Sequence, residues 1–357
     1  MRFSGFIGWA MIAACGAAAF ARPRPIVVKV VVVTMFEQGQ DTGDAPGELQ
    51  YWVERDHLDR VYAMPAAYHA VRMNAQGEMA VLTGQGTANA AATITALGLD
   101  PRFDLRHAYW LVAGIAGATP ERASLGSAVW ARWVVDGDLG YELDAREMPQ
   151  EWTTGYIPLR KAQPFEEPAT PLDGQVYALN ARLAEWAYGL TRDVALADTE
   201  KLREARSHFD GAMAQRPPSV TMGDEISSST YWHGNLMDAW ATRWVSYFTG
   251  GKGAFVTTAM EDTGTLLALK NLSRAGRVDW KRVMVLRTVS NYDRQPRGTS
   301  AAASLAQQRV GAYSAYLPSL EAAYTVGHTV VQQVLSLWPQ DERATIGSEA
   351  PSIREQK

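Results

Sequence analysis

The chain has 357 residues, of which 47% are apolar and 20% are charged, so we expect a packed core rather than a disordered chain. The formal net charge is -4, and the basic residues do not gather into a stripe, which argues against nucleic acid as a partner. The length suits one large α/β domain or two smaller ones, and no clear linker divides the chain.

The N-terminus has the features of a targeting segment. A short positive region at Met1-Arg2 precedes an apolar stretch, and Ala19-Phe20-Ala21 fits a signal-peptidase site. We therefore expect residues 1–21 to be a signal peptide and the protein to be periplasmic or secreted. A lipobox ending at Cys15 is the alternative, and it would make the protein a lipoprotein. No later stretch reaches the roughly 18 apolar residues that a membrane-spanning helix needs.

Strand-like and helix-like stretches alternate between residues 22 and 340, which predicts an α/β domain. The first strand is expected at 26–33, where a nearly continuous β-branched run suits burial on both faces of a sheet. Further strands are expected at 61–64, 68–72, 78–82, 109–118, 128–135, 220–225, 254–260 and 283–290. Helices are expected at 47–57, 87–93, 176–190, 199–213, 231–248, 265–269 and in stretches of 301–338 that are broken at Pro318.

Two segments do not fit this alternation. Residues 136–171 contain repeated prolines and are expected to form a peripheral excursion without regular structure. Residues 341–357 are expected to be a polar tail.

A glycine-rich turn leads directly into an alanine-rich helix. Gly84 and Gly86 precede Thr87, where the helix is expected to begin. Such a turn lets the backbone approach a ligand and directs helix N–H groups at it. Gly114 lies near the carboxyl end of the 109–118 strand and is a second candidate for close approach. A tight strand-to-helix turn without a ligand is the alternative at Gly84 and Gly86.

Polar residues follow two of the expected strands where each strand ends. Met260 and Glu261 follow the first, and Asn291 and Asp293 follow the second. In an open α/β sheet, ligands bind outside the carboxyl ends of the strands. If the two strands are parallel neighbours, these side chains face one crevice.

The order of these pieces resembles the nucleoside phosphorylase/nucleosidase superfamily, and more specifically the purine nucleoside permease family. The superfamily likeness is carried by the stretches at 83–86, 113–117, 223–224, 260–261 and 287–291. The closer likeness is carried by 33–37, 229–234 and 290–293, and it extends from about residue 25 to residue 337. The resemblance implies a single domain with a central mixed β-sheet flanked by helices, and a site at the strand ends.

The resemblance also implies roles for individual residues. Met260 would pack on a ribose, and Glu261 would accept hydrogen bonds from its two vicinal hydroxyls. Asn291 would lie beside N7 of a purine, where superfamily enzymes hold Asp or Asn, and Asp293 could supply the proton that the departing base needs. The residues alone leave two alternatives: a helix N-terminal charge at Glu261, and an Asx turn at Asn291 and Asp293.

The base pocket is the third implied feature. Gly223-Asp224 matches a superfamily loop that is followed by an aromatic wall for the base, which makes Asp224 a substrate-binding candidate. Tyr231 or Trp232 would then stack on the purine, although the spacing here is longer than in the nucleosidases.

The loop after the first strand bears on the reaction type. Residues 38–47 contain no Arg or Lys to hold phosphate, and Glu37 lies where a nucleosidase could use a carboxylate to orient water. Hydrolysis is therefore favoured over phosphorolysis, although Arg55, Arg72 or a neighbouring subunit could supply a cation.

We expect an exported protein that binds a small purine nucleoside and cleaves its N-glycosidic bond. It would need no cofactor or metal, with phosphate as a possible co-substrate. The alternative is a non-catalytic protein that captures nucleosides and assists their uptake. Assembly into a homo-oligomer is left open.

Overall fold

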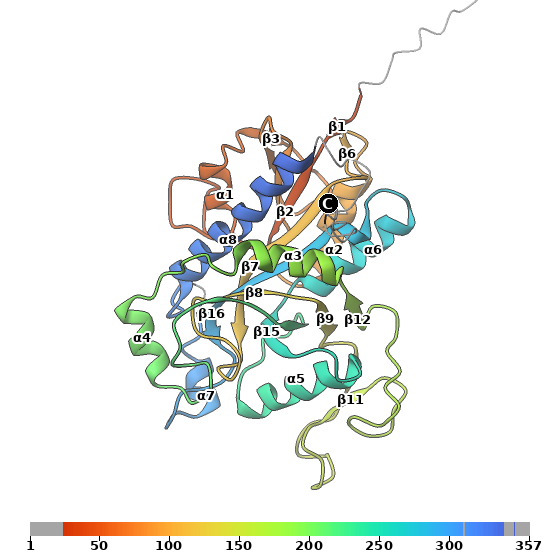
Figure 1. The fold of residues 1–357 in the computed structure, drawn as a ribbon. Coiled ribbons are helices and arrows are strands. Elements are labelled where there is room, and N and C mark those ends of the chain that lie inside the picture. Colours follow the sequence, from red (N-terminus) through yellow and green to blue (C-terminus); the bar gives the residue numbers. More distant parts are fainter. Residues whose placement is uncertain (1–23, 310, 339–345, 347–357) are drawn as a thin grey trace, which may run out of the picture.

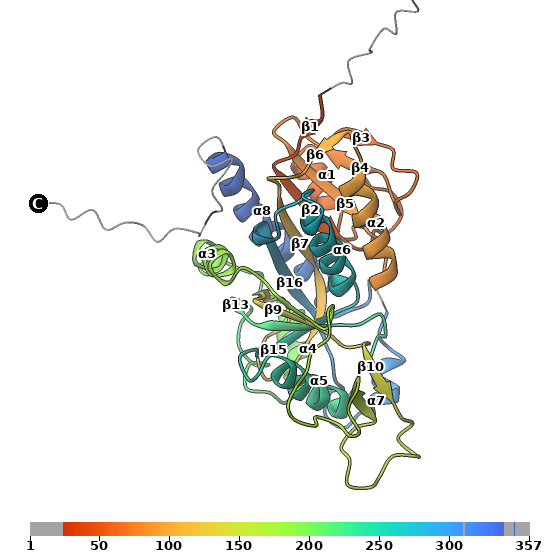
Figure 2. The same cartoon turned by 90° about the vertical axis from the view of Figure 1, so that its right-hand side faces the viewer.

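The structure is a computed structural model that describes residues 24–309, 311–338 and 346. The expected signal peptide at 1–21 and all of the expected tail except residue 346 lie outside the described residues. A large mixed sheet lies at the centre with helices on both faces (Figures 1 and 2). This is the fold class expected from the sequence.

The described elements are as follows. The strands are β1 Ile26–Val27, β2 Val30–Thr34, β3 Arg60–Tyr62, β4 Val71–Met73, β5 Glu78–Leu82, β6 Phe103–Asp104, β7 Tyr109–Ala118, β8 Ala128–Trp130, β9 Trp133–Asp136, β10 Gly140–Glu142, β11 Tyr156–Pro158, β12 Val176–Ala178, β13 Val220–Met222, β14 Asp224–Ser227, β15 Phe255–Ala259 and β16 Val283–Tyr292. The α-helices are α1 Gln50–Arg55, α2 Thr87–Leu99, α3 Ala181–Thr191, α4 Glu200–Ser207, α5 Asn235–Phe248, α6 Asp262–Arg274, α7 Ala301–Leu305 and α8 Tyr316–Leu337.

Strand β2 shows why the sheet is covered on both faces. Side chains alternate along a strand, so neighbouring valines point to opposite faces. Val31 and Val33 pack in the core beneath α2 and α6, whereas Val30 and Val32 pack in the core beneath α1, α3 and α8. Figure 2 shows these two helix layers on either side of the sheet. The unbroken β-branched run follows from burial on both sides.

An interrupted edge of β7 creates the space for a site. One edge of β7 is paired along its length with β16. On its other edge, β2 pairs only as far as Val112, and β15 begins its pairing at Gly117. Residues 113–116 therefore have no strand partner on that edge, and the strand ends of β2 and β15 meet over the gap.

Several local expectations differ from the structure. The single strand expected at 128–135 is two strands, β8 and β9, because the chain turns between them. Residues 176–178 form strand β12 rather than the start of a helix, which begins at α3. The excursion at 136–171 contains a small hairpin of β10 and β11. Periodicity over short segments does not separate these possibilities, since pairing partners far away in sequence decide them.

Pro318 does not break the last helix. It is the third residue of α8, which begins at Tyr316. Backbone N–H groups in the first turn have no intrahelical acceptor, so a proline there removes no helical hydrogen bond.

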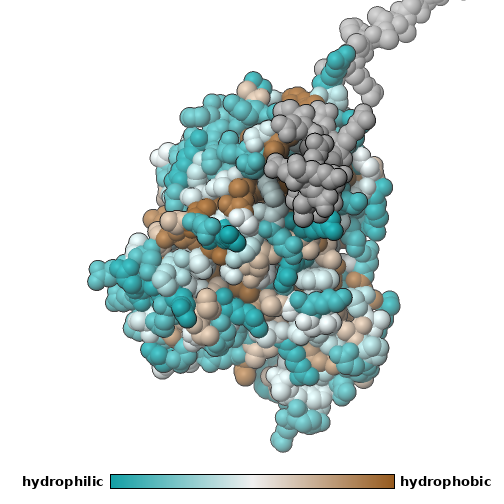
Figure 3. All heavy atoms as spheres, viewed as in Figure 1, coloured by the Kyte–Doolittle hydropathy of each residue, from teal (hydrophilic) through white to brown (hydrophobic). Residues whose placement is uncertain are grey.

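The hydrophobic residues of the surface are scattered on the face that Figure 3 shows. They form small separate groups among hydrophilic ones. Within the ranges that the structure describes, none of the helices combines the length and apolar character required to span a bilayer.

Candidate functional site

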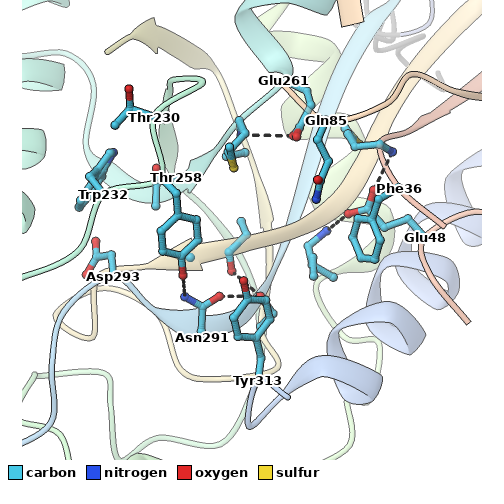
Figure 4. A pocket seen from close by; sticks show the side chains of 18 residues that line it. Phe36, Glu48, Gln85, Thr230, Trp232, Thr258, Glu261, Asn291, Asp293 and Tyr313 are labelled. Atoms are coloured by element: carbon cyan, nitrogen blue, oxygen red, sulfur yellow. Dashed lines mark hydrogen bonds between the residues drawn. The ribbon is translucent and has the colours of Figure 1, made fainter. Parts of the chain in front are cut away.

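A cavity of about 180 Å³ opens at the gap beside β7. Its walls come from the ends of β15 and β16, the carboxyl-terminal half of β7, and the loops before α1, α2, α5 and α8 (Figure 4). Six of the residues singled out from the sequence line it: Tyr231, Trp232, Met260, Glu261, Asn291 and Asp293. The structure thus brings the residues after both strands into one space.

The expectation of a shared crevice assumed that the two strands are parallel neighbours, and this assumption is wrong. β15 and β16 are not parallel neighbours, because β7 lies between them. β16 runs parallel to β7, and β15 runs antiparallel to it. Their ends meet because both pair with the same carboxyl-terminal part of β7.

Glu261 lies at one end of the cavity. It precedes the first residue of α6 and is only 6% exposed. Its Oε1 accepts the N–H of Gly86 at 3.3 Å, and its Oε2 accepts the N–H of Met260 at 3.2 Å. Burial raises its pKa, although the nearby Arg287 acts in the opposite direction. The carboxyl oxygens retain lone pairs for ligand hydroxyls.

A buried arginine organises the acidic groups behind the cavity. Arg287 on β16 makes a bidentate pair with Asp262, with both N···O distances at 2.8 Å, and lies 3.5 Å from Glu261. Burial acts to raise the pKa of Asp262, but the charge of Arg287 and a hydrogen bond from Glu225 hold it below its usual value. Burial and the charge of Asp262 raise the pKa of Glu225 well above normal, so Glu225 is the protonated partner.

Glu48 is the carboxyl group of the described cavity wall that the sequence did not reveal. Its Oε2 accepts the N–H of Met35 at 2.7 Å, and its Oε1 accepts the N–H of Ile115 at 2.7 Å. The carboxyl group therefore bridges the end of β2 and the unpaired edge of β7. Burial raises its pKa to about 8, against the charge of Arg287 and these two donors. No sequence pattern marks Glu48, because only the fold of the 35–49 loop returns it to the strand end.

Glu37, by contrast, does not line the cavity. Its Oε2 accepts the N–H groups of Leu49 and Gln50, at 2.9 and 2.7 Å, and its Oε1 accepts those of Gln38 and Gly47. These contacts occupy the carboxylate at the start of α1. Glu37 thus holds the loop that presents Glu48, and it borders a separate polar hollow beside the cavity.

Asp224 is likewise part of the framework. It is fully buried, and its Oδ1 accepts the N–H groups of Arg132 and Trp133, at 3.1 and 2.9 Å. Its Oδ2 accepts the N–H of Ala254 at 2.7 Å. Asp224 thus stabilises the turn between β8 and β9 and does not reach the cavity.

The glycine positions act by making room and by aiming the backbone. Gly84 and Gly86 have positive φ values of 78° and 86°, which favour glycine. The Gly86 N–H points at Glu261, while Thr87 bonds to Ser229 rather than lining the cavity. At Gly114, a Cβ atom would lie 2.5 Å from both Arg287 and Glu48.

Asn291 lies at the other end of the cavity, together with aromatic side chains (Figure 4). The register of β16 slips between Val289 and Asn291, which is a β-bulge of the kind that redirects a side chain. The Asn291 amide donates to the hydroxyl of Tyr231 at 3.2 Å and accepts from Ser290 at 2.8 Å. Trp232 and Tyr231 provide the apolar walls at this end.

Asp293 is the buried acid at this end. It is 1% exposed, and neither carboxyl oxygen has a hydrogen-bond donor among the described residues. Burial raises its pKa well above the usual value, and the neighbouring Asp238 raises it further. Burial therefore favours the neutral acid form of Asp293, which lines the cavity.

The described residues of the cavity wall include acidic side chains but no basic ones. Among the 18 described residues that line it, Glu48, Glu261 and Asp293 carry carboxyl groups, and none is Lys, Arg or His. Nor do the described ranges hold a group of three His, Cys, Asp or Glu side chains suited to a metal ion.

Comparison with known proteins places these features in a family. The model of a family described as purine nucleoside permease matches residues 27–346. A probable purine nucleoside permease of Schizosaccharomyces pombe is 30% identical over 327 residues, which cover 87% of this chain and 90% of the relative. A purine nucleoside permease of Candida albicans is 32% identical over 268 residues, covering 74% of this chain and 66% of the relative.

Solved structures show the same fold at low sequence identity. A 5′-methylthioadenosine/S-adenosylhomocysteine nucleosidase from S. pneumoniae has a TM-score of 0.50 and 15% identity, with 87% of this chain and 100% of that chain covered. A futalosine hydrolase of Helicobacter pylori has a TM-score of 0.50 and 14% identity, with 86% and 98% covered. At these identities the likeness concerns the fold alone.

Proposed function

The chain belongs to the purine nucleoside permease family, and on that premise we propose that it binds purine nucleosides and cleaves their N-glycosidic bond with water. The proposal concerns the cavity between Glu261 and Asn291. One observation carries it: the described residues of the wall include three carboxyl groups and no Lys, Arg or His.

This charge distribution favours water over phosphate as the nucleophile. A phosphate anion in the cavity would lose its hydration without an Arg or Lys among the described lining residues to compensate for its charge, which carries a large electrostatic cost. Arg287 is close behind the wall, but its Nε and Nη2 pair with Asp262 and its Nη1 donates to the carbonyl of Ile115 at 3.1 Å. Water carries no such electrostatic cost.

The two ends of the cavity suit the two ends of a nucleoside. Glu261 offers acceptor oxygens to a vicinal diol, and Met260 offers an apolar contact to the sugar ring. Trp232 and Tyr231 suit the faces of a purine, and Asn291 provides an amide at its edge. Glu48 lies on the ribose side, between Met35 and Ile115.

These groups can divide the reaction between them. Glu48, with its pKa near 8, accepts a proton from water as the water oxygen bonds to C1′. The C1′–N bond breaks, and its electron pair stays with the base. Asp293 donates its proton to the base and so neutralises the developing negative charge. A proton passes through solvent from Glu48 to Asp293 before the next turnover.

The test is base release from inosine and adenosine, measured by chromatography with and without phosphate. A protein comprising residues 24–357 and its Glu48→Gln and Asp293→Asn variants are each incubated with the nucleoside in parallel assays. Phosphate-independent release that both substitutions abolish is expected. Release only with phosphate would refute hydrolysis and indicate phosphorolysis.

A capture protein for nucleoside uptake is the second candidate. Asn291 favours it, because an amide cannot transfer a proton as a carboxylic acid can. Tight binding of inosine or adenosine without any base release would support capture and refute cleavage. Failure of both nucleosides to bind would refute both candidates.

Export remains part of the proposal, through the segment at 1–21 or through lipid attachment at Cys15. Expression of the full chain, followed by N-terminal sequencing and mass spectrometry of the mature protein, separates these outcomes. An uncleaved and unlipidated chain would refute export by either route.

A further inference from the structure

Asp293 has a second buried carboxyl group beside it. Asp238 lies in the first turn of α5 and is 6% exposed. Its Oδ1 has no hydrogen-bond donor in the part of the chain that the structure describes, and the same holds for both oxygens of Asp293. The backbone holds the two residues together, since Gly234 donates its N–H to the carbonyl of Asp293 at 2.8 Å and accepts the N–H of Asp238 at 2.9 Å. The charge of Asp238 and a hydrogen bond between the two carboxyl groups raise the pKa of Asp293.

Two ionised carboxylates cannot form that hydrogen bond, because each offers only acceptors. One proton between them converts the contact from repulsion to attraction, as in other buried carboxyl pairs. The second oxygen of Asp238 accepts from Arg294 at 3.1 Å, whereas neither carboxyl oxygen of Asp293 has a donor among the described residues. The proton therefore belongs on Asp293, the member that lines the cavity.

We propose that Asp238 and Asp293 share a single proton, and that Asp238 is a positioning residue that keeps Asp293 in its acid form facing the departing base. The inference rests on the proposed hydrolysis and deepens it by assigning a role to a residue outside the cavity. Asp238 does not touch the substrate. It acts through the hydrogen bond and through its negative charge.

Arg294 is a cation in contact with the pair. Arg294 also bonds to Glu121 at 2.7 Å and to the carbonyl of Asp210 at 2.8 Å, so its position is fixed independently of the pair. Tyr231 and His233 precede α5. Burial raises the pKa of Tyr231 and lowers that of His233, so both are neutral.

The proton balance follows from this arrangement. When Asp293 gives its proton to the base, two adjacent carboxylates remain, and among the described residues only Arg294 forms a salt bridge with either of them. That state is unfavourable, so Asp293 regains a proton from solvent before the next cycle. The pair thus favours the acid form of Asp293 at the start of each turnover.

The first test is the pH dependence of kcat/KM for inosine in wild type and Asp238→Asn. An acid is active below its pKa, so Asp293 sets the alkaline limb of the profile. In the variant, the charge of Asp238 is absent and the new amide N–H can donate to an ionised Asp293. Both changes move the alkaline limb to lower pH. We expect a loss of roughly 10²-fold or more in kcat at neutral pH, with KM little changed.

Glu121→Gln is the matched control, because Glu121 contacts Arg294 but not Asp293. It should leave the alkaline limb in place, and Asp238→Glu should restore part of the activity. An equal shift in Glu121→Gln would refute the inference, as would an unchanged limb in Asp238→Asn. Thermal unfolding of each variant shows whether a loss reflects misfolding instead.

A second measurement separates this inference from the proposed function. Infrared difference spectroscopy at neutral pH counts protonated carboxyl groups without any turnover. Asp238→Asn, Asp293→Asn and the double variant should each lose the absorption of one protonated carboxyl group relative to wild type. Loss of two groups in the double variant, or of none in Asp238→Asn, would overturn the shared proton. Absence of base release with the expected infrared result would refute hydrolysis alone.

Discussion

Replacement of Glu261 by Gln tests the diol contact directly. The side chain keeps its size, but one acceptor oxygen becomes an NH2 group. In the native structure the two oxygens already face N–H groups of Gly86 and Met260, and Arg287 lies 3.5 Å away. The amide must turn its NH2 toward one of these donors or toward the ligand. In either orientation, one hydroxyl of the ribose loses its acceptor.

The expected loss follows from the kind of bond removed. A hydrogen bond to a charged group contributes about 1.5–3 kcal/mol when it is buried. The dissociation constant for a purine riboside should therefore rise roughly 10- to 150-fold. Titration calorimetry with 9-deazapurine ribosides measures this without turnover, because their C1′–C bond resists hydrolysis.

Deoxy ligands make the test specific to the diol. Wild type should bind the 2′,3′-dideoxy analogue more weakly than the riboside, whereas Glu261→Gln should show a much smaller difference. Glu225→Gln is the matched control: Glu225 is a buried, protonated neighbour outside the cavity, and an amide can replace its donation to Asp262. If Glu261→Gln weakens the riboside and the dideoxy analogue equally, Glu261 does not bind the diol.

Three further outcomes are expected. Glu48→Gln should lower kcat by roughly 10²- to 10⁴-fold and remove the acidic limb of the pH profile, since the base is active only when ionised, above a pKa of about 8; an unchanged limb would exclude Glu48 as the base. Gly114→Ala should destabilise the fold by about 1–3 kcal/mol in urea unfolding, because its Cβ would overlap Arg287 and Glu48; wild-type stability would show that this space is not needed. Glu37→Gln should reduce stability by about 1 kcal/mol while kcat of the folded protein stays near wild type, because its oxygens serve the start of α1; a selective loss of kcat would return Glu37 to the chemistry.

The sequence predicted which residues stand at the ends of strands, but not which strands pair with one another. Glu261 and Asn291 could be found because each stands at the end of a strand-like run, where local structure places the side chain: Glu261 follows β15, and Asn291 is the last residue but one of β16. The neighbours of those strands could not be found. β15 and β16 both pair with β7, which lies far from them in the chain, and pairing depends on contacts that no local pattern records.

The loop between β2 and α1 shows the same limit at the level of one side chain. Glu37 and Glu48 are two carboxylates on one loop, and Glu37 stands closer to the strand end in the sequence. Four backbone N–H groups occupy Glu37, whereas Glu48 folds back toward the cavity. Which acid retains free lone pairs depends on where the backbone donors point, and composition does not encode that. The prediction that Asp224 binds substrate was wrong for the same reason, because three backbone N–H groups occupy its carboxylate.

The bridge made by Glu48 has a consequence for how the protein can be observed. Its two oxygens take the place of a missing strand, since they hold the N–H groups of Met35 and Ile115 at the interrupted edge of the sheet. Hydrogen exchange at these two amides therefore reports on a single carboxyl group. As solution pH rises through the titration of Glu48, protection at both amides should increase together relative to their neighbours. Chemistry in the cavity and the integrity of the sheet are thus linked through one side chain.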